Sequence, residues 1–246
     1  MKFTDTQEKT IGGSNFKFSH VDIGSLGATE YTLVGFVGDV SGSVSPYGPA
    51  LELMLKEVVK SCRRSPRADN LQLRTILFNQ NVTEVHGFKP LPSCNEDDYT
   101  GCIRPSGYTA LFDATYSMVK SMSQYGEELQ KQDFAVNAVL FVLTDGQDNE
   151  SKTTAAMVKD AIKEARSKEC LESIMPVLIG VGVGSDASSL DQYLQAFKNE
   201  AEFQQYIALD KADEKTLAKL GGFISKSISS QSQALGSGGA SQSVTF

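Results

Sequence analysis

The sequence predicts an α/β protein in which helices cover a mostly parallel sheet. Three runs of strand length are almost continuously apolar, at residues 30–39, 134–146 and 173–184. Such runs are typical of central parallel strands that are buried on both faces. Helical patterns separate them, whereas two further strand-like runs, 71–79 and 81–88, follow each other with only a turn between them. This hairpin predicts one antiparallel strand, which we expect at an edge of the sheet.

The first elements along the chain follow from local patterns. Residues 1–14 are polar, and we expect them to be loose, whereas the alternation in 15–24 predicts a short strand. After the strand at 30–39, the segment 45–64 is predicted to be a helix. Its prolines stand near the start, where a helix tolerates them. The apolar residues of this helix recur at spacings of three and four and form one face: Leu51, Met54, Leu55, Val58 and Val59.

Residues 89–108 form a long connection that is rich in proline, glycine and acidic residues. Loops of this length usually carry function or are mobile. Beyond it, helical and strand patterns alternate, and the last helix is expected to break near Gly221 and Gly222. The predicted elements are a helix at 109–130, a strand at 134–146, a helix at 151–169, a strand at 173–184, a helix at 188–199, a weak strand at 203–209 and a helix at 213–231.

Length and charge limit the classes of function. The 246 residues suit one large domain, which we place at 30–230, between an N-terminal extension (1–29) and a flexible C-terminal tail (231–246). A net charge of −7 argues against a sequence-independent grip on nucleic acid. No apolar run reaches the roughly 18 residues of a membrane helix, and the N-terminus lacks the apolar core of a signal peptide. We therefore expect a cytoplasmic protein that binds neither nucleic acid nor membranes.

The four cysteines and two histidines show no metal-ligand spacing. We expect free thiols, because the cysteine spacing fits no zinc signature. Cys94 and Cys102 flank one loop, so a disulfide between them under oxidising conditions stays open. His20 and His86 lie in separate strand-like segments, and we expect each to be a surface or packed residue rather than a ligand.

Five oxygen-bearing side chains stand where strands give way to helices. Asp39 ends the first buried strand, and Ser41 and Ser43 follow at alternate positions, with a glycine between them that lets the backbone turn sharply. Asp145 ends the second buried strand, and Thr109 opens the helix after the long loop. If the two strands are parallel neighbours, these residues meet at the edge where such sheets bind ligands. Two carboxylates and three hydroxyls make a hard oxygen site that suits a divalent cation.

Each of these residues also has a purely structural interpretation. Ser43 or Ser45 can cap the helix that follows, and Thr109 can cap its own helix. Asp145 can organise a strand-to-helix turn through its side chain. The combination of all five residue types in one predicted region favours the cation site over the separate structural roles.

Three segments, in this order, resemble a von Willebrand factor A (vWA) domain: DVSGS at 39–43, YTALFDA at 108–114 and FVLTDGQDN at 141–149. They are similar to the metal-ion-dependent adhesion site (MIDAS) of that family, which combines Asp-x-Ser-x-Ser with a later Thr and a later Asp. The resemblance covers about residues 30 to 230. It implies a doubly wound α/β sheet of vWA or Rossmann-like type, with helices on both faces and one antiparallel edge strand.

The resemblance also implies roles for the five residues. Ser41, Ser43 and Thr109 would bind Mg²⁺ or Mn²⁺ directly through their hydroxyls, and Asp39 and Asp145 would act through bound water or directly. In the family, a Glu or Asp of a partner protein completes the coordination shell. The implied function is a non-enzymatic protein-binding module, an intracellular adaptor or complex component of a microbial stress, defence or AAA-ATPase-linked system, with an AAA-type ATPase or an operon neighbour as its partner.

Other acidic residues lie near the motif segments. Asp148 and Glu150 either tune the cation site or cap the helix at 151–169, and we favour the cap. Asp113 is expected to face a helix surface or to support the loop before it. The acidic residues 96–98 either hold a second cation or select the partner, or they belong to a solvated loop, which we favour.

Two other functions stay open from the sequence. One is a Mg²⁺-dependent hydrolase that uses Asp39 and Asp145, but catalysis needs a positioned base, and the motif segments contain no His, Lys or Cys. The other is RNA binding, as in Ro-type ribonucleoproteins that carry such a domain. The net charge of −7 argues against it.

Overall fold

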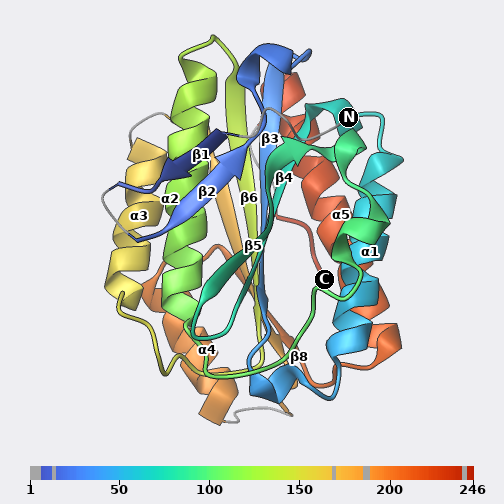
Figure 1. Cartoon of the computed structure of the whole chain (residues 1–246), viewed down its shortest axis with the longest axis vertical. Helices are drawn as coiled ribbons and strands as arrows, with labels where there is room; N and C mark the ends of the chain where they lie inside the picture. Colours follow the sequence, from blue (N-terminus) through green and yellow to red (C-terminus); the bar gives the residue numbers. More distant parts are fainter. Residues whose placement is uncertain (1–6, 13–14, 168–169, 185–188, 240–242) are drawn as a thin grey trace.

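The computed structural model describes residues 7–12, 15–167, 170–184, 189–239 and 243–246. Over these residues the chain forms one eight-stranded sheet that is flanked by five α-helices (Figure 1). The strands are β1 (Gln7–Thr10), β2 (Lys17–His20), β3 (Glu30–Asp39), β4 (Leu71–Phe78), β5 (Val82–Pro90), β6 (Ala135–Thr144), β7 (Ile174–Val181) and β8 (Gln205–Leu209). Their order across the sheet is β1-β2-β5-β4-β3-β6-β7-β8.

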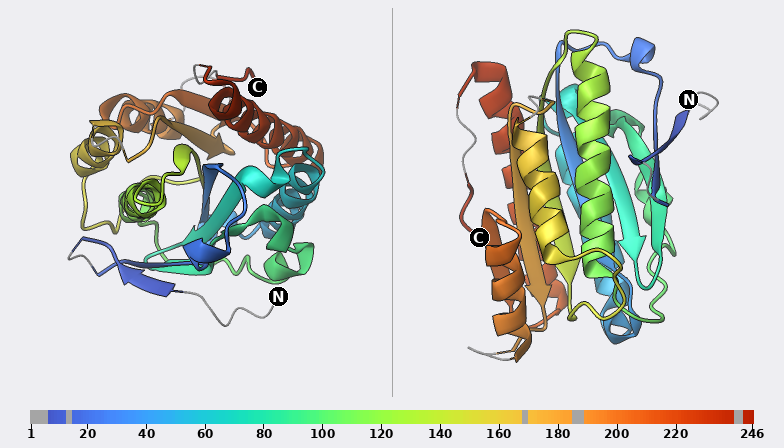
Figure 2. Two further views of the ribbon diagram at one scale, coloured as in Figure 1. Left: turned by 90° about the horizontal axis from the view of Figure 1, so that it is seen from above. Right: turned by 90° about the vertical axis from the view of Figure 1, so that its left-hand side faces the viewer.

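Helices cover both faces of the sheet (Figure 2). The α-helices are α1 (Gly48–Arg63), α2 (Leu111–Gln130), α3 (Ala155–Ser167), α4 (Ser189–Glu200) and α5 (Glu214–Ser237). α1 and α5 bury their apolar residues against one face, and α2, α3 and α4 against the other. The connections contain the 3₁₀ helices η1 (Ile23–Ser25), η2 (Gly42–Val44), η3 (Ala68–Asn70), η4 (Leu91–Ser93) and η5 (Glu96–Tyr99). The expected fold class, a doubly wound and mostly parallel α/β sheet, is confirmed.

Within the described parts of the chain, no helix combines the length and the apolar character that crossing a lipid bilayer requires.

β3 lies inside the sheet at the point where the strand order reverses. It pairs in parallel with β4 on one side and with β6 on the other. The chain passes from β3 through α1 to β4, and later from β5 through α2 to β6. Because Gly38 of β3 is aligned with Leu143 of β6, the next residues, Asp39 and Thr144, lie side by side at the carboxyl ends of the strands. Ligands of doubly wound sheets bind at such a reversal.

The predicted hairpin is confirmed, because β5 pairs antiparallel with β4. Two strands lie outside it: β2, which confirms the predicted short strand at 15–24, pairs in parallel with β5 through His20 and Phe88, and β1, in the segment expected to be loose, pairs antiparallel with β2. The close approach of β2 to β5 depends on Gly87, because a Cβ atom there would lie 2.0 Å from the carbonyl oxygen of Ser19. Part of the N-terminal extension therefore belongs to the sheet.

Two expectations about the C-terminal region are wrong. α5 runs without a break through Gly221 and Gly222, because Gly221 is buried in the packing against Met54 and Val58 of α1, which supports the helix there. The helix also includes residues 231–237, which were expected in the flexible tail. Beyond it, the ring of Phe246 packs on α5, with its centroid 5.7 Å from that of Phe223.

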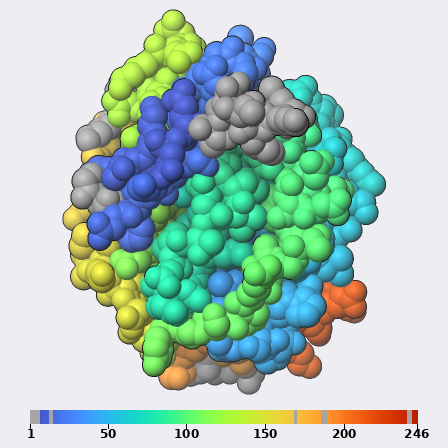
Figure 3. Space-filling view, viewed as in Figure 1, coloured from blue at the N-terminus to red at the C-terminus, as the bar shows by residue number. Residues whose placement is uncertain are grey.

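The segment 89–108 is held more firmly than the expected solvated loop. η4 and η5 occupy its first half. Glu96 forms an ion pair with Arg63, and Asp98 forms one with the buried Lys89. The later part of the segment crosses the lower part of the surface, in green in Figure 3. Two of its three adjacent acids are thus neutralised by side chains of the protein.

Replacement of Gly87 by alanine tests the close approach of β2 to β5. We expect Gly87→Ala to lower the free energy of unfolding by more than about 1 kcal/mol, because the methyl group meets backbone that cannot move aside easily. Gly222→Ala is the matched control: the position is exposed on α5 with open space around it, so alanine should stabilise the protein by about 0.5–1 kcal/mol. Urea unfolding measures both variants, and a Gly87→Ala protein as stable as the wild type would contradict the close approach.

Candidate metal centre

The first segment of the candidate site is a tight turn at the carboxyl end of β3. The strand ends at Asp39, which is 0% exposed. The amide of Val40 donates to the carbonyl of Phe78 at 2.8 Å and extends the strand pairing by one residue. The amide of Gly42 donates to the carbonyl of Gly107 at 3.2 Å, and η2 then leads the chain toward α1. This turn presents the two serines of the motif at the edge of the sheet.

A continuous series of hydrogen bonds joins four of the five predicted ligands. Asp39 Oδ1 accepts from the amide of Ser41 at 2.8 Å, and its Oδ2 accepts from the hydroxyl of Thr144 at 2.6 Å. The hydroxyl oxygens of Ser41 and Ser43 lie 3.0 Å apart. The hydroxyl of Ser43 donates to Asp145 Oδ1 at 2.7 Å. Residues more than one hundred positions apart in the sequence therefore meet at the carboxyl ends of β3 and β6.

Thr109, the fifth predicted ligand, reaches the same edge from the loop before α2. It is buried, and its amide donates to the side-chain oxygen of Asn149 at 2.9 Å, while the amide of Asn149 donates to the Thr109 carbonyl at 3.0 Å. A Cβ atom on Gly146 would lie 3.4 Å from Thr109 Oγ1. The hydroxyl of Thr109 is thus placed beside the residue that follows Asp145.

Two further carboxylates hold the surrounding loops in place. Asp148 accepts from the amide of Phe112 in the first turn of α2 at 3.1 Å and from the amide of Ser151 at 3.2 Å. Asp113 in turn accepts from the amide and the hydroxyl of Thr153 at 2.9 and 2.8 Å. The expectation that Asp148 caps the helix after it is wrong, because the side chain reaches across to α2. These reciprocal bonds fix Thr109 and Asp145 relative to each other.

The centre carries negative charge in a buried setting. Burial raises the pKa of Asp39 to about 6, and the charge of Asp145 adds to this, although the hydrogen bonds from Thr144 and Ser41 act in the opposite direction. In the described part of the chain, neither aspartate forms an ion pair with Lys, Arg or His. A buried carboxylate without a cation is costly, and this one lies where a cation would offset the cost.

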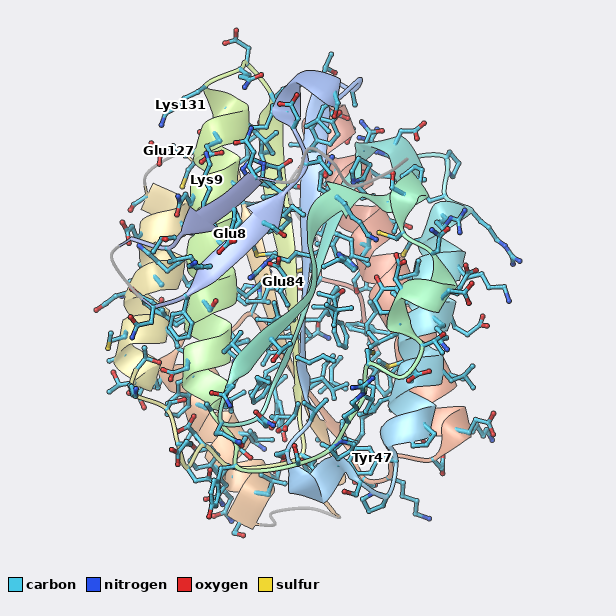
Figure 4. All side chains as sticks on the ribbon, viewed as in Figure 1. Glu8, Lys9, Tyr47, Glu84, Glu127 and Lys131 are labelled. Atoms are coloured by element: carbon cyan, nitrogen blue, oxygen red, sulfur yellow. The ribbon has the colours of Figure 1, made fainter. Side chains whose placement is uncertain are left out.

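Tyr47 places a buried hydroxyl beside the two carboxylates of the candidate centre. Its hydroxyl is buried and interacts with the carboxylate of Asp145. Burial raises the pKa of this hydroxyl, and the neighbouring carboxylates of Asp145 and Asp39 raise it further. The residue lies just before α1 at the lower end of the molecule in Figure 4. Buried polar groups nearly always have a partner, and this hydroxyl lies beside the same carboxylates that the predicted site uses.

The donor set suits a small, hard cation. Mg²⁺ has octahedral oxygen ligands at about 2.0–2.1 Å, which places neighbouring ligand oxygens about 3 Å apart. The observed separations are 3.0 Å between Ser41 and Ser43 and 2.7 Å between Ser43 and Asp145. The described residues contain no group of three or more His, Cys, Asp or Glu side chains that could hold a metal. A cation site at this edge would therefore depend on the serine and threonine hydroxyls of the predicted ligand set.

The structure brings the five predicted residues to one edge, but their role as metal ligands stays a prediction. Sequence reasoning missed Thr144 and Tyr47, although Thr144 had a usable signal, because it directly precedes Asp145 in a buried strand. The other candidates lie apart from this set. His86 bonds to Tyr99 at 2.6 Å. Cys94 and Cys102 carry free thiols.

The raised pKa of Asp39 predicts how the metal-free protein responds to pH. Its folded-state pKa of about 6 lies above the ordinary value of 3.8, so the folded state binds more protons between these values. Stability should therefore fall as pH rises from about 4 through 6, by about 3 kcal/mol. In EDTA, the Asp39→Asn variant should not show this loss of stability with rising pH, because the asparagine side chain cannot ionise. Thermal unfolding against pH measures the difference, and parallel curves for the two proteins would refute a raised pKa.

No protein-family model matches the chain, and no curated protein sequence matches it. Its fold is similar to that of solved structures. The PilB minor pilin from Streptococcus sanguinis has a TM-score of 0.61 and 16% identity over 85% of this chain and 63% of the pilin. The SpaC pilus adhesin from Lactobacillus rhamnosus GG has a TM-score of 0.57 and 12% identity over 92% and 34%.

A third similar structure is the proximal thread matrix protein 1 from the mussel byssus, described with a zinc-occupied MIDAS motif. Its TM-score is 0.50, with 21% identity over 82% of this chain and 46% of that protein. The chain thus spans less than two thirds of the length of each of these three proteins. At these identities the likeness shows the fold.

Proposed function

We propose that this chain is a vWA-type module that binds another protein through a divalent cation, Mg²⁺ or Mn²⁺. The residues that would hold the cation are Asp39, Ser41, Ser43, Thr109 and Asp145. The observation that carries the proposal is the buried carboxylate of Asp39, which lies without an ion pair among the described residues and at one end of a series of hydrogen bonds to Ser41, Ser43 and Asp145.

The choice of ligands explains why such a cation would attract a partner. Three of the five residues are neutral hydroxyls, and Asp39 is already engaged by Ser41 and Thr144. A cation held mainly by neutral oxygens keeps most of its positive charge, and Mg²⁺ readily accepts a further carboxylate. A Glu or Asp of a partner protein would supply that carboxylate. The chain's own part is to position the hydroxyls and to exclude water from the buried side.

The non-enzymatic nature of the module is part of the proposal. Hydrolysis would need a base beside the attacking water. The side chains that interact with the predicted ligands come from Thr144, Asn149, Tyr47 and the ligands themselves, as far as the described residues show. None of these side chains is a His, Lys or Cys, and the carboxylate of Asp39 is buried and already accepts hydrogen bonds from Ser41 and Thr144. The proposal also keeps the cytoplasmic setting and the AAA-type ATPase or operon neighbour as the expected class of partner.

Two neighbouring serines provide a matched test of the cation site. We expect Ser43→Ala to weaken Mg²⁺ binding by about tenfold or more, because it removes a direct ligand. Ser45→Ala should leave the affinity unchanged, because this exposed hydroxyl donates to the Gly42 carbonyl and lies outside the predicted set. Isothermal titration calorimetry with Mg²⁺ measures both. Equal affinity in the two variants, or no Mg²⁺ binding by the wild type, would reject the proposal.

A further inference from the structure

An exposed aromatic residue directly precedes one of the predicted ligands of the candidate metal centre. Tyr108 is 64% exposed and directly precedes Thr109. The described residues include two other large apolar side chains with substantial exposure, Leu53 on α1 and Met157 on α3. Single exposed apolar residues are normal and need no explanation. Tyr108 differs because of its position and because of the way its backbone is held.

Hydrogen bonds on both sides fix the backbone around Tyr108. Its own amide donates to Oε1 of Gln80 at 3.0 Å. Before it, the amide of Ser106 donates to the carbonyl of Val40, in the turn after β3, at 2.9 Å. After it, the amide of Thr109 donates to Oδ1 of Asn149 at 2.9 Å. We call residues 106–109 the rim of the centre. The side chains that hold it, Gln80 and Asn149, are uncharged and so do not select a partner by its charge.

Gly107 ties this rim to the serine motif. Its φ angle is +75°, and a Cβ atom there would lie 1.7 Å from Oε1 of Gln80. Its carbonyl accepts from the amide of Gly42, the residue between Ser41 and Ser43, at 3.2 Å. The backbone that carries the tyrosine ring is therefore attached directly to the backbone that carries two of the predicted ligands.

An aromatic ring on a fixed backbone is well suited to be an energetic centre of an interface. It offers a large apolar area and loses little conformational entropy when a partner binds. Tyrosine is also enriched among the residues that dominate binding energies. A carboxylate anchored at the neighbouring cation would bring its flanking residues over this ring.

Building on the proposed function, we propose that Tyr108 is the second contact of the partner. The partner is a protein segment that carries an aromatic or large aliphatic residue within two positions of the Asp or Glu that reaches the cation. The cation selects the acid, and Tyr108 selects its apolar neighbour. Affinity for the metal and choice of partner then depend on different residues, because the side chain of Tyr108 is not one of the predicted metal ligands.

Defined peptides test this division. The probes are acetylated and amidated pentapeptides: Gly-Gly-Glu-Gly-Gly, the same peptide with Gln in place of Glu, and four peptides in which phenylalanine replaces one glycine of the first. Each is titrated by NMR into the full chain with Mg²⁺ and with EDTA. The proteins are the wild type, Tyr108→Ala and the control Leu53→Ala, which removes an exposed apolar side chain in a groove between α1 and α5. Calorimetry measures the Mg²⁺ affinity of each protein.

We expect at least one phenylalanine peptide to bind the Mg²⁺-loaded wild type about three- to tenfold more tightly than the glycine peptide. Tyr108→Ala should lose this preference and keep its Mg²⁺ affinity, while Leu53→Ala keeps both. A preference that survives in Tyr108→Ala, or none in the wild type, overturns the role of Tyr108, yet leaves the proposed function standing if Glu peptides bind only with Mg²⁺. If no peptide binds in a Mg²⁺-dependent way, both proposals fail.

Discussion

A buried carboxylate without a counter-ion is the constraint on which the candidate centre depends. Asp39 is fully buried at the end of a central strand, and its acceptor atoms are engaged by the Ser41 amide and the Thr144 hydroxyl. These bonds favour the charged form, but burial outweighs them and raises the pKa to about 6. The protein thus holds a charge that its described side chains do not neutralise, and a bound cation would remove that cost.

The topology of the sheet determines which residues share this environment. The parallel register of β3 and β6 sets Asp39 beside Thr144, and the next residue of that chain segment, Asp145, accepts from Ser43. Hydrogen bonds join the loop before α2 to both of these segments: Gly107 bonds to the serine turn after β3, and Thr109 bonds to the segment after β6. Three segments that are distant in the sequence hold one another, and this mutual support also fixes the exposed rim that we assign to the partner.

Much of this arrangement was predictable, because the central strands are long apolar runs that end at polar residues. The strand at 30–39 has the predicted bounds, and the hairpin and the helix order follow from period and turn chemistry. β1 was not predicted, because its residues are polar and it pairs only at the sheet edge. The break near Gly221 was wrong, because packing against α1 outweighs the low helix propensity of glycine. The contacts of Asp148 with Phe112 and of Tyr47 with Asp145 gave no local signal, because these partners come from distant segments.

The most direct test of the central claim is an anomalous-scattering map from crystals of the full chain soaked in Mn²⁺. The account predicts one peak at the carboxyl ends of β3 and β6, bonded to hydroxyl oxygens of the DVSGS turn and of the loop before α2, and lost in crystals of Ser43→Ala. A map without a peak there, or with manganese bound only elsewhere on the molecule, would contradict it.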